Sequence, residues 1–261
     1  MRGQTSVVLL SIAALMVSCT SSNETSSAPT TSTTSPAGKN DSPPVVTPLL
    51  ASILAAPIPV PATDGKVHLA YELHLTNVLN QELTLTSVDV RATERTVLSL
   101  EGDRLAYWTR ALGNPTPTTK LGPAQSAAGW LDVALDPGAT VPAELVHAVG
   151  VSVPQPQPPL FPATLTETVA PVTVQTHKPA VIAPPLIGPH LHFQVMSTAD
   201  PLRSDGLPFV FSSFTLDGRI AAMDAEDAVA AGQPAPMQPR FARRHESAVS
   251  PLVLDVMSYA G

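Results

Sequence analysis

The feature that most constrains the fold is a strict alternation of apolar and other residues in KVHLAYELHLT, residues 66–76. Successive side chains of a β-strand point to opposite faces, so a period of two predicts a strand with one buried face. The apolar positions are Val67, Leu69, Tyr71, Leu73 and Leu75. Residues 77–80 give a turn signal, after which ELTLTSVDVRA resumes the alternation. The apolar residues are at odd positions up to Leu85 and at even positions from Val88 on. This change predicts a β-bulge near Thr86 and Ser87.

Three further stretches have strand patterns: TVLSLEG, GWLDVALD and LVHAVGVSV. Short strands separated by connections rich in Gly, Pro and Asn are typical of an antiparallel sandwich. We therefore predict a mainly β protein that begins with an antiparallel β-sandwich at residues 57–155. Residues 156–187 are rich in proline, which central strands exclude, so they are predicted to be an extended connector or edge.

Composition favours an extracytoplasmic, loop-rich protein. Only 13% of the residues are charged, whereas about 25% is usual in soluble proteins. The chain also contains 29 prolines. The net charge of −7 argues against a nucleic-acid partner.

Residues 1–19 have the pattern of a lipoprotein signal peptide. The apolar run VVLLSIAALMV is too short to span a bilayer comfortably and ends in a sequence that resembles a bacterial lipobox. Cys19, the single cysteine, is the predicted lipidation site; the alternative is a signal-sequence cysteine without a role. Lipidation would anchor the protein to a membrane outside the cytoplasm. The Ser/Thr/Pro-rich residues 20–56 are predicted to be a tether.

The histidines of the sandwich are not predicted to form a metal site. His68 and His74 share the polar face of one strand but stand about 20 Å apart, so we expect them to be solvated. His147 has the parity of the apolar residues around it and is predicted to be half-buried and hydrogen-bonded. No pair of nucleophile and base is evident in this region.

The stretch GPHLHFQV carries the strongest chemical signal. If it is a strand, His190 and His192 lie on one face with Cα atoms about 6.6 Å apart, close enough to reach one zinc ion. Together with DPLRSDGLPFVFSSF, it resembles the C-terminal end of a lysostaphin-type (LytM-type) zinc metallopeptidase domain, which cleaves peptidoglycan peptides. The YELHLTN region is similar to the β domain that precedes some of these peptidases. The resemblance implies that His192 binds zinc and that His190 polarises the attacking water or stabilises the transition state.

The sequence departs from that family in one essential respect. The upstream His-x-x-x-Asp motif, which supplies two further zinc ligands, is absent. A catalytic zinc normally needs three protein ligands, so zinc binding is possible but the site is incomplete. Four acids could in principle substitute: Asp200, Asp205, Glu226 and Glu246. We therefore expect residues 188–218 to be a truncated, metal-free β remnant of a peptidase domain.

The C-terminal tail, residues 219–261, has three features of its own. The alanine-rich stretch at residues 219–233 predicts a short helix. Arg240, Arg243 and Arg244 form a basic cluster that could contact an anionic polymer or lipid, although a solvated charge run is the favoured interpretation. PLVLDVM predicts a last strand.

Three hypotheses for function follow. The first, which we favour, is a membrane-anchored envelope lipoprotein whose sandwich binds peptidoglycan or an envelope protein and whose peptidase segment is non-catalytic. The alternative is an active zinc metalloendopeptidase that hydrolyses peptidoglycan peptide bonds with substitute ligands. The third is a truncated product without a selected function.

Overall fold

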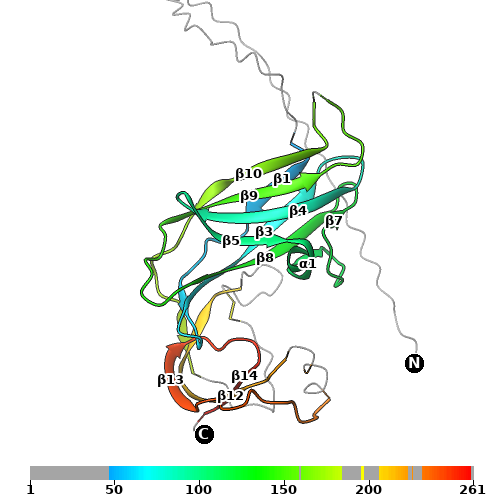
Figure 1. The fold of residues 1–261 in the computed structure, drawn as a ribbon. Helices are drawn as coiled ribbons and strands as arrows, with labels where there is room; N and C mark the ends of the chain where they lie inside the picture. The colour runs from blue at the N-terminus through cyan, green and yellow to red at the C-terminus, as the bar shows by residue number, and fades with distance from the viewer. Residues whose placement is uncertain are drawn as a thin grey trace, which may run out of the picture. The chain divides into compact units, whose positions relative to one another are not determined.

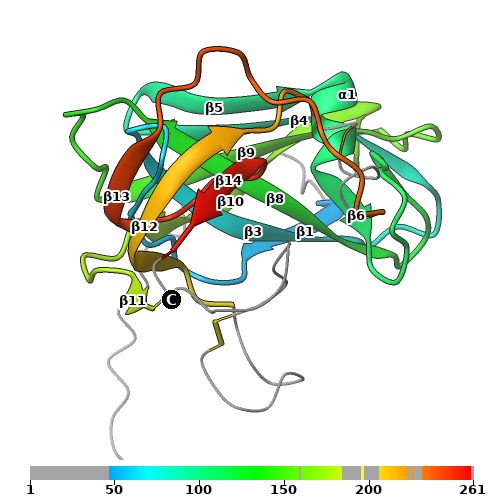
Figure 2. The same cartoon turned by 90° about the horizontal axis from the view of Figure 1, so that it is seen from below.

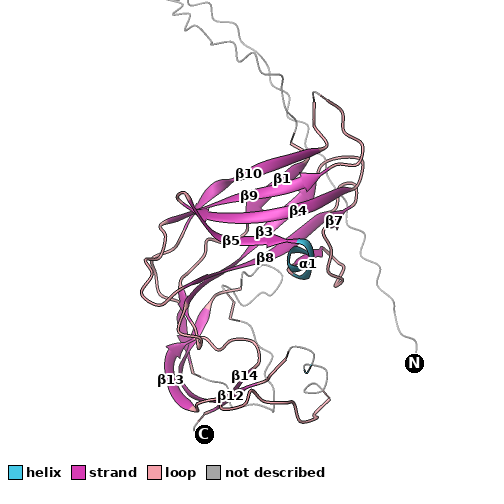
Figure 3. Cartoon of the chain, viewed as in Figure 1, coloured by secondary structure: helices cyan, strands magenta, loops and turns pink. Residues whose placement is uncertain are grey.

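The computed structural model describes residues 47–158, 160–183, 195–196, 206–222, 225 and 231–259. Within these ranges the chain forms three sheets and one short helix (Figure 1; Figure 3). The predicted mainly β fold is confirmed. Cys19, His190 and His192 lie outside the described residues. No helix in the described ranges is long and apolar enough to cross a membrane.

The first sheet is antiparallel and has the order β1–β3–β8–β6, with β2 paired to the start of β3. Its strands are β1 (Leu49–Ile53), β2 (Val60–Pro61), β3 (Val67–Asn77), β6 (Thr109–Ala111) and β8 (Ser126–Leu135). The strand predicted from the alternation is β3, the longest of these. The turn after it is held by Asn77, whose buried side chain accepts a hydrogen bond from the Leu79 N–H and donates to the Leu121 carbonyl.

The second sheet is also antiparallel, with the order β10–β9–β4–β5 and β7 paired to β4. Its strands are β4 (Leu83–Ala92), β5 (Arg95–Glu101), β7 (Lys120–Leu121), β9 (Glu144–Ser152) and β10 (Thr164–Thr173). Helix α1 (Gly102–Tyr107) connects β5 of this sheet to β6 of the first. Gly102 has a φ of +53°, which a residue with a side chain adopts only under strain, and it turns the chain from β5 into α1.

The inward faces of the two sheets form one core. Alternate residues of β3, from Leu69 to Leu75, are at most 4% exposed. Figure 2 shows β4, β5 and β9 lying across β1, β3 and β8, and the side chains between these two layers make a single cluster of 21 buried residues. The predicted antiparallel sandwich is therefore present, and its alternating pattern identified the buried face.

The predicted bulge in β4 is confirmed. The register between β4 and β9 shifts between Leu85 and Ser87. A Cβ atom on Gly150 of β9 would lie 2.5 Å from the Ser87 hydroxyl and 2.6 Å from the Thr86 hydroxyl. The bulge therefore fits because the facing residue is glycine.

The sandwich extends beyond the predicted range of 57–155 on both sides. Strand β1 lies in the predicted tether, and it joins the sheet because Leu49 is completely buried. Strand β10 lies in the predicted connector. It is an edge strand, and its register shifts between Val169 and Val172, around Pro171. An edge strand tolerates a proline that a central strand would not.

The third sheet is built around β12 (Phe209–Arg219), which pairs in parallel with β11 (Ala180–Ile182) and antiparallel with β13 (Arg244–Val249) and β14 (Asp255–Ser258). Strand β14 confirms the strand predicted near the C-terminus. The buried centre of this sheet consists of Phe211, Phe214 and Leu216.

The helix predicted at residues 219–233 does not begin where expected. Arg219 is the last residue of β12, and Ile220 forms a β-bridge with Met237. The β pairing of this end of β12 overrides the helical preference of the alanines, as tertiary contacts often do. Residues 223–224 and 226–230 lie outside the described part of the chain.

Candidate functional site

A cavity of about 700 Å³ lies over the outer face of the first sheet. Its floor is made by side chains of β3 and β8 that point away from the sandwich core: His68, Ala70, Glu72, Trp130 and Asp132. Residues on the other side include Leu207 to Phe209, at the start of β12, and Leu252, between β13 and β14. The cavity therefore lies between the sandwich and the third sheet.

One row of residues crosses the sheet at this cavity. Glu72 of β3 lies opposite Trp130 of β8. The backbone N–H of Trp130 donates to the backbone carbonyl of Trp108 at 2.9 Å, so the two tryptophans occupy neighbouring positions across the sheet. Leu54 follows β1 and takes the place on the other side of Glu72, because its N–H donates to the Glu72 carbonyl. The order across the sheet is Leu54, Glu72, Trp130, Trp108.

The two tryptophans are the only ones in the chain, and both line the cavity. Trp130 is 41% exposed and Trp108 is 43% exposed, although large aromatic side chains are usually well covered. In the adjacent row the small side chain of Ala70 lies beside Asp132. The small Ala70 side chain leaves space beside the two tryptophans, and the carboxylates of Glu72 and Asp132 lie in the same two rows.

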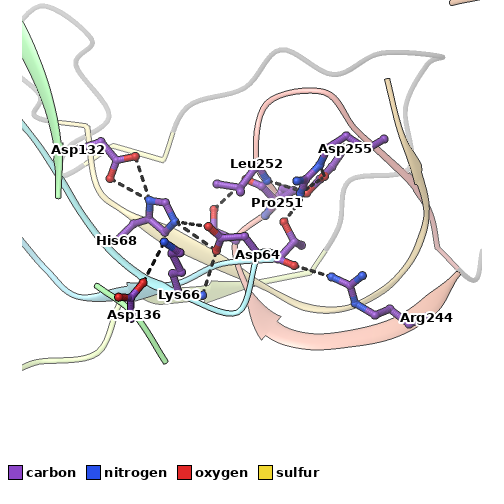
Figure 4. A network of polar contacts seen from close by, with 12 residues as sticks. Asp64, Lys66, His68, Asp132, Asp136, Arg244, Pro251, Leu252 and Asp255 are labelled. Atoms are coloured by element: carbon purple, nitrogen blue, oxygen red, sulfur yellow. Dashed lines mark hydrogen bonds and ion pairs between the residues drawn. The ribbon is translucent and has the colours of Figure 1, made fainter. Parts of the chain in front are cut away.

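His68 lies at one end of the cavity between two carboxylates (Figure 4). Its Nδ1 atom is 2.9 Å from both oxygens of Asp132, and its Nε2 atom is 3.2 Å from Asp64. The Lys66 backbone N–H also donates to Asp64, and the Lys66 ammonium pairs with Asp136 at 3.0 Å. His68 was predicted to be solvated, but its side chain is only 12% exposed.

These contacts favour the charged forms of the partners. Hydrogen bonding to Asp132 raises the pKa of His68 above its ordinary value, against the effect of burial, and Asp64 adds to the rise. Burial tends to raise the pKa of Asp64, but the Lys66 N–H and His68 outweigh it, so that pKa is lowered. The imidazolium form satisfies both carboxylates at once, because both ring nitrogens then donate.

The geometry around His68 does not suit a metal. Its two nitrogens are on opposite edges of the ring, and each faces a different carboxylate, so the three side chains do not converge on one point. Among the described residues, no group of three or more His, Cys, Asp and Glu side chains is placed to hold a metal ion.

The loop that carries Asp64 also connects the sandwich to the third sheet. The Thr63 N–H donates to the Ser250 carbonyl, and the Ser250 N–H donates to the Pro61 carbonyl at 2.8 Å. The Thr63 hydroxyl donates to Asp255 of β14, and the Arg244 guanidinium donates to the Thr63 carbonyl. Figure 4 shows this junction directly beside the His68 contacts.

Asp255 is the central acceptor of the junction. Its side chain is fully buried, and it is 2.7 Å from both the Nε and a terminal nitrogen of Arg219. It also accepts a hydrogen bond from the Leu252 N–H at 2.9 Å. The carboxylate is therefore satisfied by strands and loops from both regions.

A second histidine is buried in the sandwich core. His147 is completely buried, and its Nε2 atom is 2.8 Å from the Tyr71 hydroxyl, while its Nδ1 atom has no hydrogen-bonding partner in the described part of the chain. Burial lowers the pKa of His147 to about 4. The predicted hydrogen bond is present, but the residue is more deeply buried than predicted, because β9 faces the core at this position.

Most residues proposed from the peptidase resemblance fall outside the described part: His190, His192, Asp200, Asp205 and Glu226. Glu246 is described, and its carboxylate accepts a hydrogen bond from Arg244 at 2.6 Å. Arg243 pairs with Asp217. Two of the three arginines of the basic cluster are thus engaged within the third sheet.

The row that contains Trp130 and Trp108 was not predicted from the sequence. Trp130 is at a polar-face position of GWLDVALD, and a large aromatic residue at such a position is the signal that could have revealed it.

Comparison with known proteins does not assign the chain to a family. It matches no protein-family model, and no recognisable relative was found among curated proteins.

Proposed function

We propose that this protein is a lipoprotein of a bacterial cell envelope that binds an envelope ligand, with peptidoglycan as the expected partner, and does not hydrolyse it. The ligand site is the cavity over the first sheet. Cys19 attaches the protein to the membrane, and residues 20–46 separate that anchor from the first strand.

The observation that carries this proposal is the composition of the cavity wall. A binding site is typically a concave apolar surface with a few polar groups, and its volume is commonly about 300–1,000 Å³. The cavity of about 700 Å³ meets that description, because two half-exposed tryptophans lie beside Glu72 and the His68 contacts. Tryptophan is enriched among the residues that contribute most to binding energy, so two neighbouring, half-exposed tryptophans favour a binding surface.

The non-catalytic character is proposed from the ligand set. The sequence supplies the His-x-His pair of the resembled peptidases but not the motif for the other two ligands. A zinc that activates water needs three protein ligands and an open position.

The test uses the protein from Thr20 onward, which retains every described residue. It is incubated with purified insoluble peptidoglycan and sedimented, and the supernatant is assayed for released peptide fragments with and without added zinc. We expect the protein to sediment with the polymer and to release no fragments. Trp130→Ala should abolish sedimentation.

Leu50→Ala is the matched control, because Leu50 is an exposed apolar residue of the same sheet that does not line the cavity. It should sediment like the unmodified protein. Zinc-dependent fragment release that is lost in His192→Ala, with about one bound zinc per chain, would instead establish the peptidase alternative. Equal sedimentation of the Trp130→Ala variant would exclude the cavity as the site.

A further inference from the structure

We infer that the cavity binds an organic cation, an ammonium group carried on an apolar body, with Glu72 as its counter-ion and the tryptophans as its aromatic wall. This inference rests on the proposal that the cavity is the ligand site, and it specifies the chemistry of the ligand.

Glu72 is the first part of the argument. It lines the cavity and lies between Leu54 and Trp130 in the row, and in the described part of the chain its carboxylate has no hydrogen-bonding or ion-pair partner. A half-buried carboxylate beside apolar groups loses hydration, and a cationic ligand would restore a favourable contact.

No cation of the described cavity lining neutralises that carboxylate. The lining includes neither lysine nor arginine. His68 is held by two aspartates, which together carry at least as much negative charge as the imidazolium carries positive charge. The other histidine of the lining is His177.

Arg110, which follows the cavity residue Trp108 by two residues in the chain, is already engaged. Its guanidinium donates to the carbonyls of Ala106 and Tyr107. It also lies over the Tyr107 ring, 6.0 Å from the centroid. The guanidinium is therefore held at the C-terminal end of α1, where it contacts backbone carbonyls.

The aromatic wall supplies the second attraction. Trp108 and Trp130 are neighbours in the row that contains Glu72, and each exposes more than two fifths of its surface. The face of an indole ring attracts cations, and this attraction is strongest for tryptophan among the aromatic residues. An ammonium ion that also contacts a carboxylate is therefore favoured over a neutral group of the same shape.

The test is tryptophan fluorescence of the protein from Thr20 onward, at pH 8. Both tryptophans of the chain line the cavity, so the whole signal reports on it. Choline is compared with 3,3-dimethyl-1-butanol, which has the same shape without the charge. We expect choline to change the fluorescence at about tenfold lower concentration, as cation–π attraction of this order predicts.

Two variants make the result specific. Glu72→Gln should bring the choline titration close to that of the neutral alcohol. Glu144→Gln changes an exposed acid on the second sheet and should leave the preference for choline intact. Salt should weaken choline binding to the unmodified protein, because the interaction is between charges.

Other outcomes would overturn the inference. Equal titrations with choline and the alcohol, or N-acetylglucosamine acting at lower concentration than choline, would show that the site does not select a cation. If no probe acts while sedimentation with peptidoglycan still depends on Trp130, the inference fails and the proposed function stands. If sedimentation does not depend on Trp130, the proposed function fails independently of the choline result.

Discussion

The sandwich and the third sheet are stabilised in different ways. Among the described residues, the sandwich encloses 21 buried apolar residues between two sheets, whereas the buried cluster of the third sheet has three. Burial of a large apolar side chain contributes about 1.5–3 kcal/mol, so the sandwich has the larger share of hydrophobic stabilisation. The third sheet is instead connected to the sandwich by polar contacts at Thr63 and Asp255. It follows that the sandwich should be stable by itself and that the third sheet should depend on the junction.

The largest effect is expected for Asp255→Ala. The substitution leaves Arg219 without its buried carboxylate, and breaking such a pair costs about 3–5 kcal/mol. We expect hydrogen exchange to become fast throughout β12 to β14 and to stay slow in β3 and β8.

Asp217→Ala is the control for that experiment. Asp217 is on the same strand as Arg219, but it pairs with the mostly exposed Arg243, and such a pair contributes at most about 1 kcal/mol. Fast exchange in the sandwich of the Asp255→Ala variant would contradict the asymmetry between the two regions.

Leu73→Ala tests the opposite direction. Leu73 is completely buried in the sandwich, and the cavity left by the substitution should cost about 2–5 kcal/mol. Because the third sheet depends on the loop between β2 and β3, both regions should lose protection together. Urea unfolding measures the loss, and Leu50→Ala on the exposed face should change it little. A third sheet that keeps its full protection in this variant would show that it folds independently.

Acid should weaken the sandwich through His147. Its pKa is about 4 when folded and about 6.5 when unfolded, so between these values the unfolded chain binds a proton that the folded chain does not. Stability should therefore fall as the pH decreases from 6.5 to 4, by about 3 kcal/mol from this residue. Urea midpoints measured across that range give the slope. The double variant Tyr71→Phe, His147→Leu should have a shallower slope, and an unchanged slope would show that another group is responsible.

The smallest effect, of opposite sign, is expected at the junction. The pKa of His68 is raised, so its stabilising contribution is fully present below pH 6.5 and is lost as the pH rises through the folded-state pKa. After correction for intrinsic exchange rates, the amides of Thr63 and Ser250 should be better protected at pH 6 than at pH 9. His68→Gln should remove this difference. Protection that increases with pH would contradict the assigned charge of His68.

The parts of the fold that could be predicted are those with a long local pattern. The alternation in β3 identified its buried face, and the change of parity in β4 located the bulge. Edge strand β1 was not predicted, because it is short. The prolines around β10 left two predictions open for its region, a connector or an edge, and β10 is an edge strand. Helix α1 has only six residues, too few for a helical period to be evident.

The candidate site depends on pairings that no local pattern encodes. His68 meets Asp132 across 64 positions because β3 and β8 pair in one particular register. The same register brings Glu72 beside Trp130, and the pairing of β6 with β8 places Trp108, directly before β6, next to Trp130. The sequence indicated which face each residue occupies, but the neighbours on that face follow only from the sheet order.

The most direct test of the central proposal is an NMR titration of the isotope-labelled protein with soluble peptidoglycan fragments. The two tryptophan indole N–H groups give two separate signals, and both come from the cavity wall. We predict that both signals shift and saturate together, while the backbone amide of Glu167 on β10 does not move. Binding that shifts other signals and leaves both indole signals in place would contradict the assignment of the site.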